Sequence, residues 1–342
     1  MSKGYVDADG HVMEDAEDIL RFVRAPYNNR GTRNWIPSLD HFHTPADGTP
    51  RTPGTFDPNT GPEQWLEFLD KTGTDYTVLY PTTGLAYGNV AYPQWALAYA
   101  QGYNDYIHAR YLKRSPRFQA VALIPMQHVP DAVTELRRAV KDLGFIGAMI
   151  PSNGLTRHVS HPEYWPIYEE AEKLNCIMAV HGGSYINLGF NTYTVFPATR
   201  ALGMPFPLAI ALTGMMVDGL LDRFPKLRFV FLESGAGWLP YWFYRLDEHY
   251  EVLGNQVPEL KTMPSKLLER GQLYFSCEAD ETEIPHVIET IGDDWIVFAS
   301  DYSHFDSRFP GASAPIIDNQ KLSETSKRKI LNDNARRLYP LL

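Results

Sequence analysis

The sequence predicts an α/β fold, a (β/α)8 barrel of the TIM type, from three observations. Along its 342 residues, eight short runs rich in Val, Ile and Phe are each followed by a helix-like stretch. The runs are almost continuously apolar, which is typical of strands buried on both faces of a parallel sheet. No Gly-rich phosphate loop follows the first run, which disfavours the rival interpretation, a doubly wound open sheet. Eight strand–helix units favour the barrel.

Taken in order, the predicted strands cover residues 5–9, 76–80, 118–124, 145–150, 176–181, 227–233, 273–278 and 295–301. The predicted helices cover residues 62–71, 93–113, 129–143, 162–174, 206–224, 238–252, 283–291 and 324–338. Within residues 129–143, Val133, Leu136, Val140 and Leu143 repeat at intervals of three and four, with basic residues between them. That spacing is typical of a helix on the outer ring of a barrel.

Two stretches depart from the alternation of strands and helices. Residues 15–61 are dense in Pro, Gly, Asn and Arg and also hold several aromatic residues, and residues 182–202 are polar and aromatic. Both follow a strand, so both are expected to lie over the C-terminal ends of the strands, where barrel active sites are found. We interpret them as lids on one domain that spans residues 1–342.

The composition excludes several classes of protein. A net charge of −10 without a basic stripe argues against binding to nucleic acid or to an anionic membrane. Only two cysteines are present, far apart, which excludes a disulfide scaffold and a thiolate metal site. Because the N-terminal residues include no apolar signal core, we expect a cytoplasmic protein. We also expect its partner to be a small-molecule substrate.

The ends of three predicted strands carry potential metal ligands. The first strand ends in Asp9 and His11, which are two residues apart and therefore lie on the same face of the strand. The fifth strand ends in His181 and the eighth in Asp301. Two imidazoles and two carboxylates at the same end of a barrel form a site for one divalent metal ion. The alternative is that the aspartates cap helices and His181 is a buried, hydrogen-bonded residue.

The order of these motifs resembles that of the amidohydrolase superfamily. Asp9-x-His11, His181-Gly-Gly and Ser-Asp301-Tyr-x-His304 appear in its order, and residues 224–229 resemble the lead into strand six in the "amidohydrolase 2" branch. That branch includes decarboxylases of aminocarboxymuconate semialdehyde and γ-resorcylate. The resemblance implies a distorted barrel with one Zn or Mn ion, no organic cofactor and a homodimer. It also implies that Asp301 both ligates the metal and moves a proton.

Two residues depart from the family pattern. Asp9 replaces the first histidine of the usual His-x-His, and two carboxylate ligands favour Mn²⁺ or Mg²⁺ over Zn²⁺. Glu233 stands at the end of strand six, where the family usually has histidine. Glu233 can act as a base or as a neutral acid. The alternative is that it caps the helix that begins near Trp238.

Other side chains are candidates for contact with the substrate. His304, three residues after Asp301, is expected to touch the metal ligands or the substrate. Tyr80 and Glu278 end strands two and seven at the same face, and in the first lid Arg51 can pair with a carboxylate while His43 can touch the substrate. The alternative for the lid residues is solvent exposure or packing.

Together with these features, the resemblance to the amidohydrolase superfamily implies a metal-dependent enzyme that removes CO₂, without oxidation, from a small aromatic or unsaturated carboxylic acid. A hydrolase of an amide, ester, lactone or carbon–carbon bond that uses metal-activated water is one alternative. A barrel that only binds a ligand is the other.

Overall fold

Eight parallel strands form the centre of the protein, as predicted. The computed structural model describes residues 4–29, 60–183, 188–193, 196–304, 307–309 and 311–339. The strands follow one another in the sheet in the order β1 to β8. They are β1 (Tyr5–Val12), β2 (Thr74–Pro81), β3 (Phe118–Ala122), β4 (Gly147–Pro151), β5 (Ile177–His181), β6 (Arg228–Leu232), β7 (Leu273–Glu278) and β8 (Ile296–Ala299).

The sheet closes into a barrel where the residues after β8 meet β1. The amide of Asp301 donates to the carbonyl of Asp9 at 2.9 Å, and the amide of His11 donates to the carbonyl of Tyr302 at 2.6 Å. Because these bonds alternate between the two segments, they fix the end of β8 beside the end of β1. This closure brings residues almost 300 positions apart in the chain into contact.

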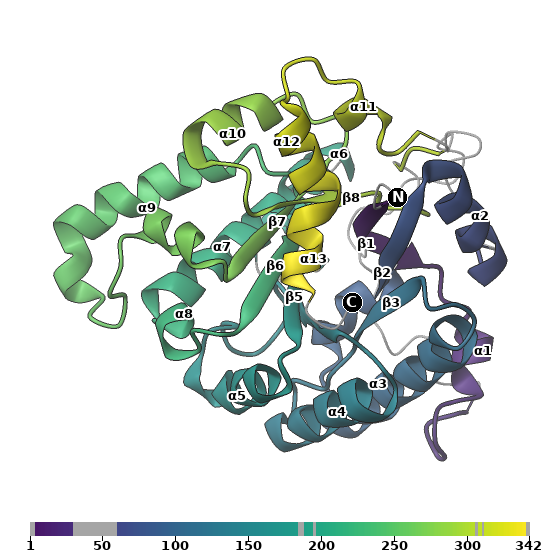
Figure 1. Ribbon diagram of the computed structural model, residues 1–342. Helices are drawn as coiled ribbons and strands as arrows, with labels where there is room; N and C mark the ends of the chain where they lie inside the picture. The colour runs from purple at the N-terminus through teal and green to yellow at the C-terminus, as the bar shows by residue number, and fades with distance from the viewer. Residues whose placement is uncertain are drawn as a thin grey trace.

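Helices surround the strands (Figure 1). The main ones in the described residues are α2 (Pro62–Thr72), α3 (Pro93–Ile107), α4 (Val129–Asp142), α5 (Trp165–Leu174), α7 (Pro205–Val217), α9 (Leu239–Leu253) and α10 (Ile284–Ile291). Shorter ones are α1 (Ala16–Leu20), α6 (Phe196–Gly203), α8 (Leu220–Arg223), α11 (Ala314–Ile317), α12 (Glu324–Arg328) and α13 (Asn334–Leu338).

Helices α12 and α13 lie in front of the strands in the view of Figure 1. The side-chain amide of Asn334 donates to the carbonyl of Ile296 at 2.7 Å, and that of Asn332 donates to the carbonyl of Gly4. These contacts place α13 where β1 and β8 begin. The C-terminal ends of the strands therefore face away from the viewer of Figure 1.

The helices differ from the predictions in several places, among them the helix expected over 93–113, which ends at Ile107 and continues as a π-helical segment, His108–Leu112. The single helix expected over 206–224 is two helices, because Gly219 adopts a φ of +70° between α7 and α8. The helix expected over 324–338 includes a π-helical segment, Lys329–Asp333. The second predicted lid holds a helix, α6, that its polar composition did not indicate. Of the first predicted lid, residues 15–29 carry α1, and residues 30–59 lie outside the described part.

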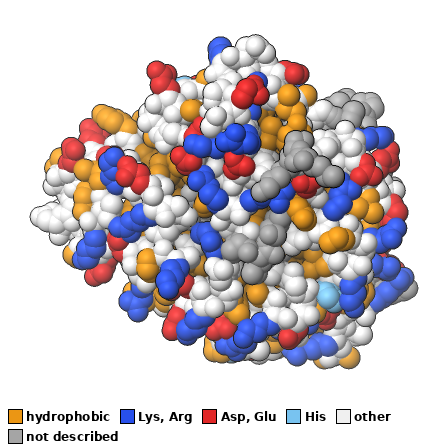
Figure 2. All heavy atoms as spheres, viewed as in Figure 1, with side chains coloured by type: hydrophobic (Ala, Val, Ile, Leu, Met, Phe, Trp, Pro, Cys, Tyr) orange, Lys and Arg blue, Asp and Glu red, His pale blue; other side chains and the backbone are white. Residues whose placement is uncertain are grey.

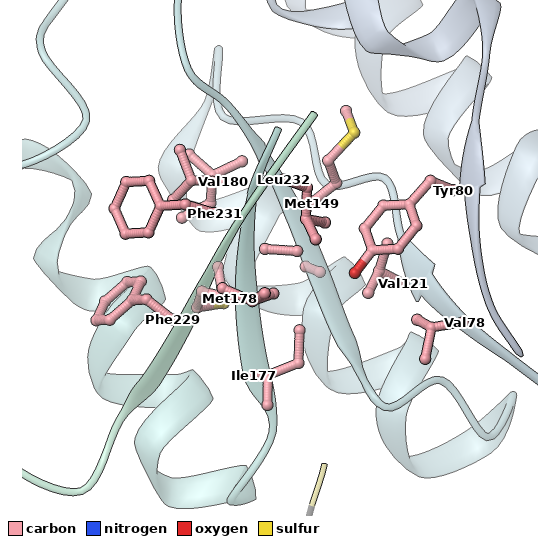
Figure 3. Packing of buried hydrophobic residues seen from close by; sticks show 14 of the residues in the cluster. Val78, Tyr80, Val121, Met149, Ile177, Met178, Val180, Phe229, Phe231 and Leu232 are labelled. Carbon is pink, nitrogen blue, oxygen red and sulfur yellow. The ribbon is translucent and has the colours of Figure 1, made fainter. Parts of the chain in front are cut away.

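The inner strands are buried on both faces, as their apolar sequences predict. All residues of β4 and β5 are buried. In Figure 3, Phe229 and Phe231 of β6 lie on one side of the strands and the ring of Tyr80 on the other. Side chains therefore fill both the barrel and the layer between barrel and helices.

Asp7 is a buried carboxylate that ties three strands together. Its Oδ2 accepts hydrogen bonds from the hydroxyls of Thr77 and Ser300, both at 2.8 Å, and its Oδ1 accepts one from the Ser300 amide at 2.8 Å. Burial raises the pKa of Asp7 to about 7 although these hydrogen bonds oppose the rise. Asp7 thus links β1 to β2 and to the end of β8, directly below the closure.

The viewed surface mixes charges of both signs (Figure 2). Basic and acidic side chains are interspersed there without a continuous basic stripe. One helical stretch of the described residues, Pro197–Val217, is long and apolar enough to cross a membrane, by length and composition only. Half of its most apolar window is buried inside the protein, as is common for a core helix.

Replacing Asp7 by Asn should change how stability depends on pH. The folded protein binds a proton at Asp7 up to about pH 7, whereas an unfolded aspartate loses its proton near pH 3.8. Rising pH therefore lowers the free energy of unfolding of the wild type, by roughly 1 kcal/mol per pH unit inside that window. In Asp7→Asn this dependence is absent, so the variant should gain stability relative to the wild type as pH rises. Urea unfolding of metal-depleted protein at pH 5 and 7.5 measures it; equal differences at both pH values would contradict the assignment.

Candidate metal centre

Five polar side chains meet at the C-terminal ends of the strands. Asp9 and His11 belong to β1, and His181 is the last residue of β5. Glu233 directly follows β6, and Asp301 comes two residues after β8. The first three and Glu233 are buried, and the side chain of Asp301 is 15% exposed. The site therefore combines residues from four strands around the barrel axis.

The first strand is shaped to present two of these side chains. One more residue of β1 than of β2 lies between the pairs Asp7↔Thr77 and Gly10↔Leu79, so β1 carries a bulge at this point. A Cβ atom at Gly10 would lie 2.4 Å from the Trp65 ring, so only glycine allows that ring to pack here. The indole of Trp65 donates to the carbonyl of His11 at 3.1 Å. This packing holds the bulge that carries Asp9 and His11.

Both histidines turn the Nε2 atom toward the centre of the site. His11 Nδ1 lies 2.9 Å from the carbonyl oxygen of Pro81, and His181 Nδ1 lies 2.7 Å from that of Gly182. A carbonyl only accepts, so each Nδ1 carries a proton and donates it. In the neutral rings, each Nε2 then has a free lone pair. This arrangement is typical of metal-ligating histidines.

The spacing of the inward atoms fits one metal ion. Asp9 Oδ1 lies 3.4 Å from Nε2 of both His11 and His181, and Glu233 Oε2 lies 3.7 and 3.8 Å from the same two atoms. Two ligand atoms about 2.1 Å from a metal, at tetrahedral angles, are roughly 3.4 Å apart. Within the described residues these four atoms are buried without a hydrogen-bond partner. Such atoms are costly to bury unless a cation satisfies them.

Asp301 lies beside this group and contacts His304. Its Oδ1 is 3.3 Å from His11 Nε2 and 2.7 Å from His304 Nδ1. His304 Nε2 lies 3.1 Å from the hydroxyl of Thr82, and the ring of His304 stacks on that of His11 at 3.8 Å. The carboxylate and the imidazole can share one proton. Asp301, His304, His11 and Glu233 also form a second group with the spacing of metal ligands.

Glu233 does not cap the following helix, which removes one of the two roles considered for it. The amides of Ala236 and Gly237 instead donate to the carboxylate of Glu281, and the Ala236 amide lies 2.9 Å from Glu281 Oε2. Glu233 adopts a φ of +75°, and Asp301 one of +50°. A non-glycine residue in this region is strained, and such strain is frequent at functional sites. The two strained carboxylates both point into the site.

The charges of the site depend strongly on one another. Burial opposes ionisation of Asp9, yet the imidazoles of His181 and His11 lower its pKa below the usual range. Burial likewise opposes protonation of His11, but Asp9 and Glu233 raise the pKa of His11 to about 10. The pKa of Glu233 is well below its usual range because His11 and Arg200 outweigh burial. Burial and the neighbouring His11 lower the pKa of His304. Without a metal, the carboxylates therefore hold a proton on His11.

A cavity of about 230 Å³ opens beside Glu233 and Asp301. Its lining includes Arg200 from α6, Glu278 at the end of β7, and Arg308. Arg200 Nη2 lies 3.0 Å from Glu233 Oε1, and Arg308 pairs with Asp280. The cavity therefore offers both carboxylates and guanidinium groups close to the potential metal ligands.

The structure places the other predicted site residues as follows. Glu278 is exposed and lines the cavity. Tyr80 is fully buried, with its ring 5.4 Å from that of His181, below the histidines. Arg51 and His43 lie outside the described residues. The roles predicted for them in substrate binding stay predictions.

Arg200 was missed by the sequence reasoning. It lies inside the stretch interpreted as a polar lid, and neither a strand end nor a motif marks it. A signal was nevertheless present, because Arg200 is the only lysine or arginine between Lys173 and Arg223. A lone cation in a long uncharged stretch near an acidic site is a candidate partner for a buried carboxylate.

Known proteins resemble the chain over nearly its full length. The sequence model of the amidohydrolase family matches residues 6–341. A 2-amino-3-carboxymuconate-6-semialdehyde decarboxylase of Dictyostelium discoideum is 29% identical over 318 residues, covering 89% of this chain and 84% of the relative. A gamma-resorcylate decarboxylase of Rhizobium sp. (strain MTP-10005) is 28% identical over 294 residues, covering 81% and 86%.

A solved structure confirms the fold. It is that of a dihydroxybenzoic acid decarboxylase from Polaromonas sp. JS666, with bound manganese and the inhibitor 2-nitroresorcinol. It matches with a TM-score of 0.72 at 22% identity and covers 99% of this chain and 97% of that one.

Metal binding to the metal-depleted protein should strengthen as pH rises. His11, with a pKa raised to about 10, has to lose its proton before Nε2 can bind a metal. Between pH 6 and 8 the affinity for Mn²⁺ should therefore rise by up to about tenfold per pH unit. Calorimetric titration measures it, with His128→Gln, a change at an exposed histidine, as the control that keeps the slope. An affinity that stays constant over this range would argue against a protonated His11.

Proposed function

We propose that this chain, which belongs to the amidohydrolase family, is a metal-dependent enzyme that removes CO₂ from a small aromatic or unsaturated carboxylic acid. The relatives named above, which are 28–29% identical, are decarboxylases of such acids. The reaction needs no oxidant, because a proton replaces the carboxyl group on carbon.

One observation carries the proposal: Asp301 lies between the metal ligands and the cavity, with His304 as its partner. A proton on Asp301, which pairs with His304, can reach a substrate in the cavity because the Asp301 side chain lines that cavity. The cavity of about 230 Å³ is smaller than the roughly 300–1,000 Å³ of drug-sized pockets, which suits a small acid.

Asp301 is the better proton donor of the two carboxylates considered. Glu233 faces the Arg200 guanidinium and His11, which keep it ionised. Asp301 instead pairs with His304, whose neutral imidazole can share a proton with it. Asp301 gives its proton to the carbon that bears the carboxylate. The bond to the carboxyl carbon then breaks, its electron pair stays on the substrate, and CO₂ leaves.

Asp9, His11, His181 and Asp301 hold the metal in this proposal. When bound, a divalent ion supplies a positive centre that orients an anionic substrate and stabilises the charge that develops on it. Manganese is the preferred candidate over zinc because the site is rich in carboxylate oxygen and because the Polaromonas structure holds manganese.

Four further expectations belong to the same proposal. They are a single domain over residues 1–342, a homodimer, a cytoplasmic location and the absence of an organic cofactor. The family match over residues 6–341 and the single eight-stranded sheet support the single domain. The resemblance to the family supports the homodimer, which size-exclusion chromatography with light scattering tests.

CO₂ release from a panel of hydroxybenzoates in the presence of Mn²⁺ tests the reaction. We expect turnover of at least one acid, and a loss of roughly 100-fold or more in kcat for Asp301→Asn, because general acid catalysis commonly contributes 10²–10⁴-fold. The matched control is Asp70→Asn, an exposed aspartate outside the site. Metal content is measured in parallel to separate lost metal from lost proton transfer.

A different outcome would reject the decarboxylase. If the protein turns over aryl esters or amides and releases CO₂ from none of the acids, it is a hydrolase. If it holds no stoichiometric divalent metal and turns over neither class, it is a binding protein.

A further inference from the structure

We propose that Glu233 is itself a ligand of the metal and that Arg200 is its positioning residue, so that the pair shifts the site toward Mn²⁺. The inference rests on the metal centre of the proposed function but not on the reaction. It replaces the base or acid role considered for Glu233. The metal would then have two imidazole nitrogens and up to three carboxylates as protein donors.

The position of Glu233 Oε2 is that of a ligand atom. It lies 3.7 Å from His11 Nε2 and 3.8 Å from His181 Nε2, and all the inward atoms of Asp9, His11, His181 and Glu233 lie within 4.8 Å of one another. Oε2 is buried and has no hydrogen-bond partner in the described part of the chain. A bound cation would satisfy it together with the two Nε2 atoms.

Glu233 is not the residue that caps the turn after β6. Glu281, from the loop after β7, already accepts the amides of Ala236 and Gly237. Strand β5 pairs His181 with Leu232, so Glu233 extends one position beyond His181 toward the open end of the barrel. Its left-handed backbone then directs the carboxylate to the same centre as His181.

Arg200 fixes which oxygen of Glu233 faces the metal. Its guanidinium lies 3.0 Å from Oε1, so only Oε2 is available for the metal. Arg200 reaches this place because α6 packs close to the end of β5. A Cβ at Gly182 would lie 2.7 Å from the Met204 sulfur, in the turn between α6 and α7, so glycine permits this approach.

The charge balance of the site also requires that Glu233 and Arg200 occur together. Asp9, Glu233 and Asp301 carry three negative charges when ionised, one more than a divalent ion neutralises. Arg200 adds the missing positive charge, so the complete centre is neutral. Glu233 without Arg200 would leave a buried negative charge unbalanced, which is costly in a dry site.

The donor set determines the metal preference. Carboxylate oxygens suit Mn²⁺ and Mg²⁺ relatively better, whereas Zn²⁺ prefers few ligands with nitrogen or sulfur among them. Zn²⁺ still binds most sites more tightly in absolute terms. The measurable consequence is that Glu233 contributes more to the affinity for Mn²⁺ than to that for Zn²⁺.

Metal titration of the metal-depleted full chain tests this inference without any substrate. In Glu233→Gln, we expect the Kd of Mn²⁺ to rise at least tenfold and that of Zn²⁺ to rise less. The electron paramagnetic resonance spectrum of bound Mn²⁺ should change as one carboxylate is lost. The matched control is Glu278→Gln, which removes a carboxylate from the same cavity but outside both ligand groups, and should leave both Kd values within twofold.

Arg200→Met provides a second, independent test that leaves Glu233 in place. We expect a smaller loss of Mn²⁺ affinity, about threefold to tenfold, together with a changed Mn²⁺ spectrum. Thermal melts confirm that each variant is folded, and if Glu233→Gln fails to fold, Arg200→Met and Glu233→Asp decide. An unchanged Kd and an unchanged spectrum in the folded variants would overturn the inference.

The outcome is distinguishable from failure of the proposed function. If Glu233→Gln loses Mn²⁺ as expected while no acid is decarboxylated, the ligand stands and the reaction is wrong. If the wild type releases CO₂ but Glu233→Gln leaves the metal affinity unchanged, the proposed reaction stands and the assignment of Glu233 as a metal ligand is wrong.

Discussion

The hydrogen-bonded closure between β1 and the end of β8 is the constraint on which the site depends. It consists of the amide of Asp301 on the carbonyl of Asp9, and the amide of His11 on the carbonyl of Tyr302. Below it, Asp7 binds Ser300 through both backbone and hydroxyl. Because backbone bonds fix the two segments, the side chains of Asp9, His11 and Asp301 start from fixed backbone positions.

Burying so many ionisable groups at one place is unfavourable unless their charges balance. Asp9, His11, His181 and Glu233 are all buried, and each of the two imidazoles lies within hydrogen-bond distance of a backbone carbonyl through Nδ1. In the absence of a metal, His11 keeps a proton to offset the carboxylates around it. A divalent ion replaces that proton with a larger charge and satisfies the inward atoms at once. The same electrostatics explain both the raised pKa of His11 and the fit to a metal.

The sequence predicted the barrel and the strand ends well because both depend on local patterns. Strands of continuous apolar residues give the order of the barrel, and His181 or Asp301 at a strand end then lies at the open face by geometry alone. Tertiary contacts could not be read in the same way. The turn after β6 is capped by Glu281, forty-five residues beyond Ala236. The partner of Glu233 is Arg200, which lies in a helix that the polar composition of its segment did not predict. Both contacts join segments that are far apart in the chain, and a single sequence carries no spacing rule for such contacts.

The carboxylate at the end of β6 is best understood together with its surroundings. Since Glu281 supports the turn, position 233 is free to change without loss of the helix that follows. A histidine there would place another neutral or cationic ring beside those of His11, His181 and His304, whereas a glutamate adds a negative charge that requires a cation of its own. Arg200 supplies that cation at Oε1, 3.0 Å away, while the two histidines face Oε2. Glu233 and Arg200 therefore function as one unit, and a change at either position alters the charge that the metal and the substrate encounter.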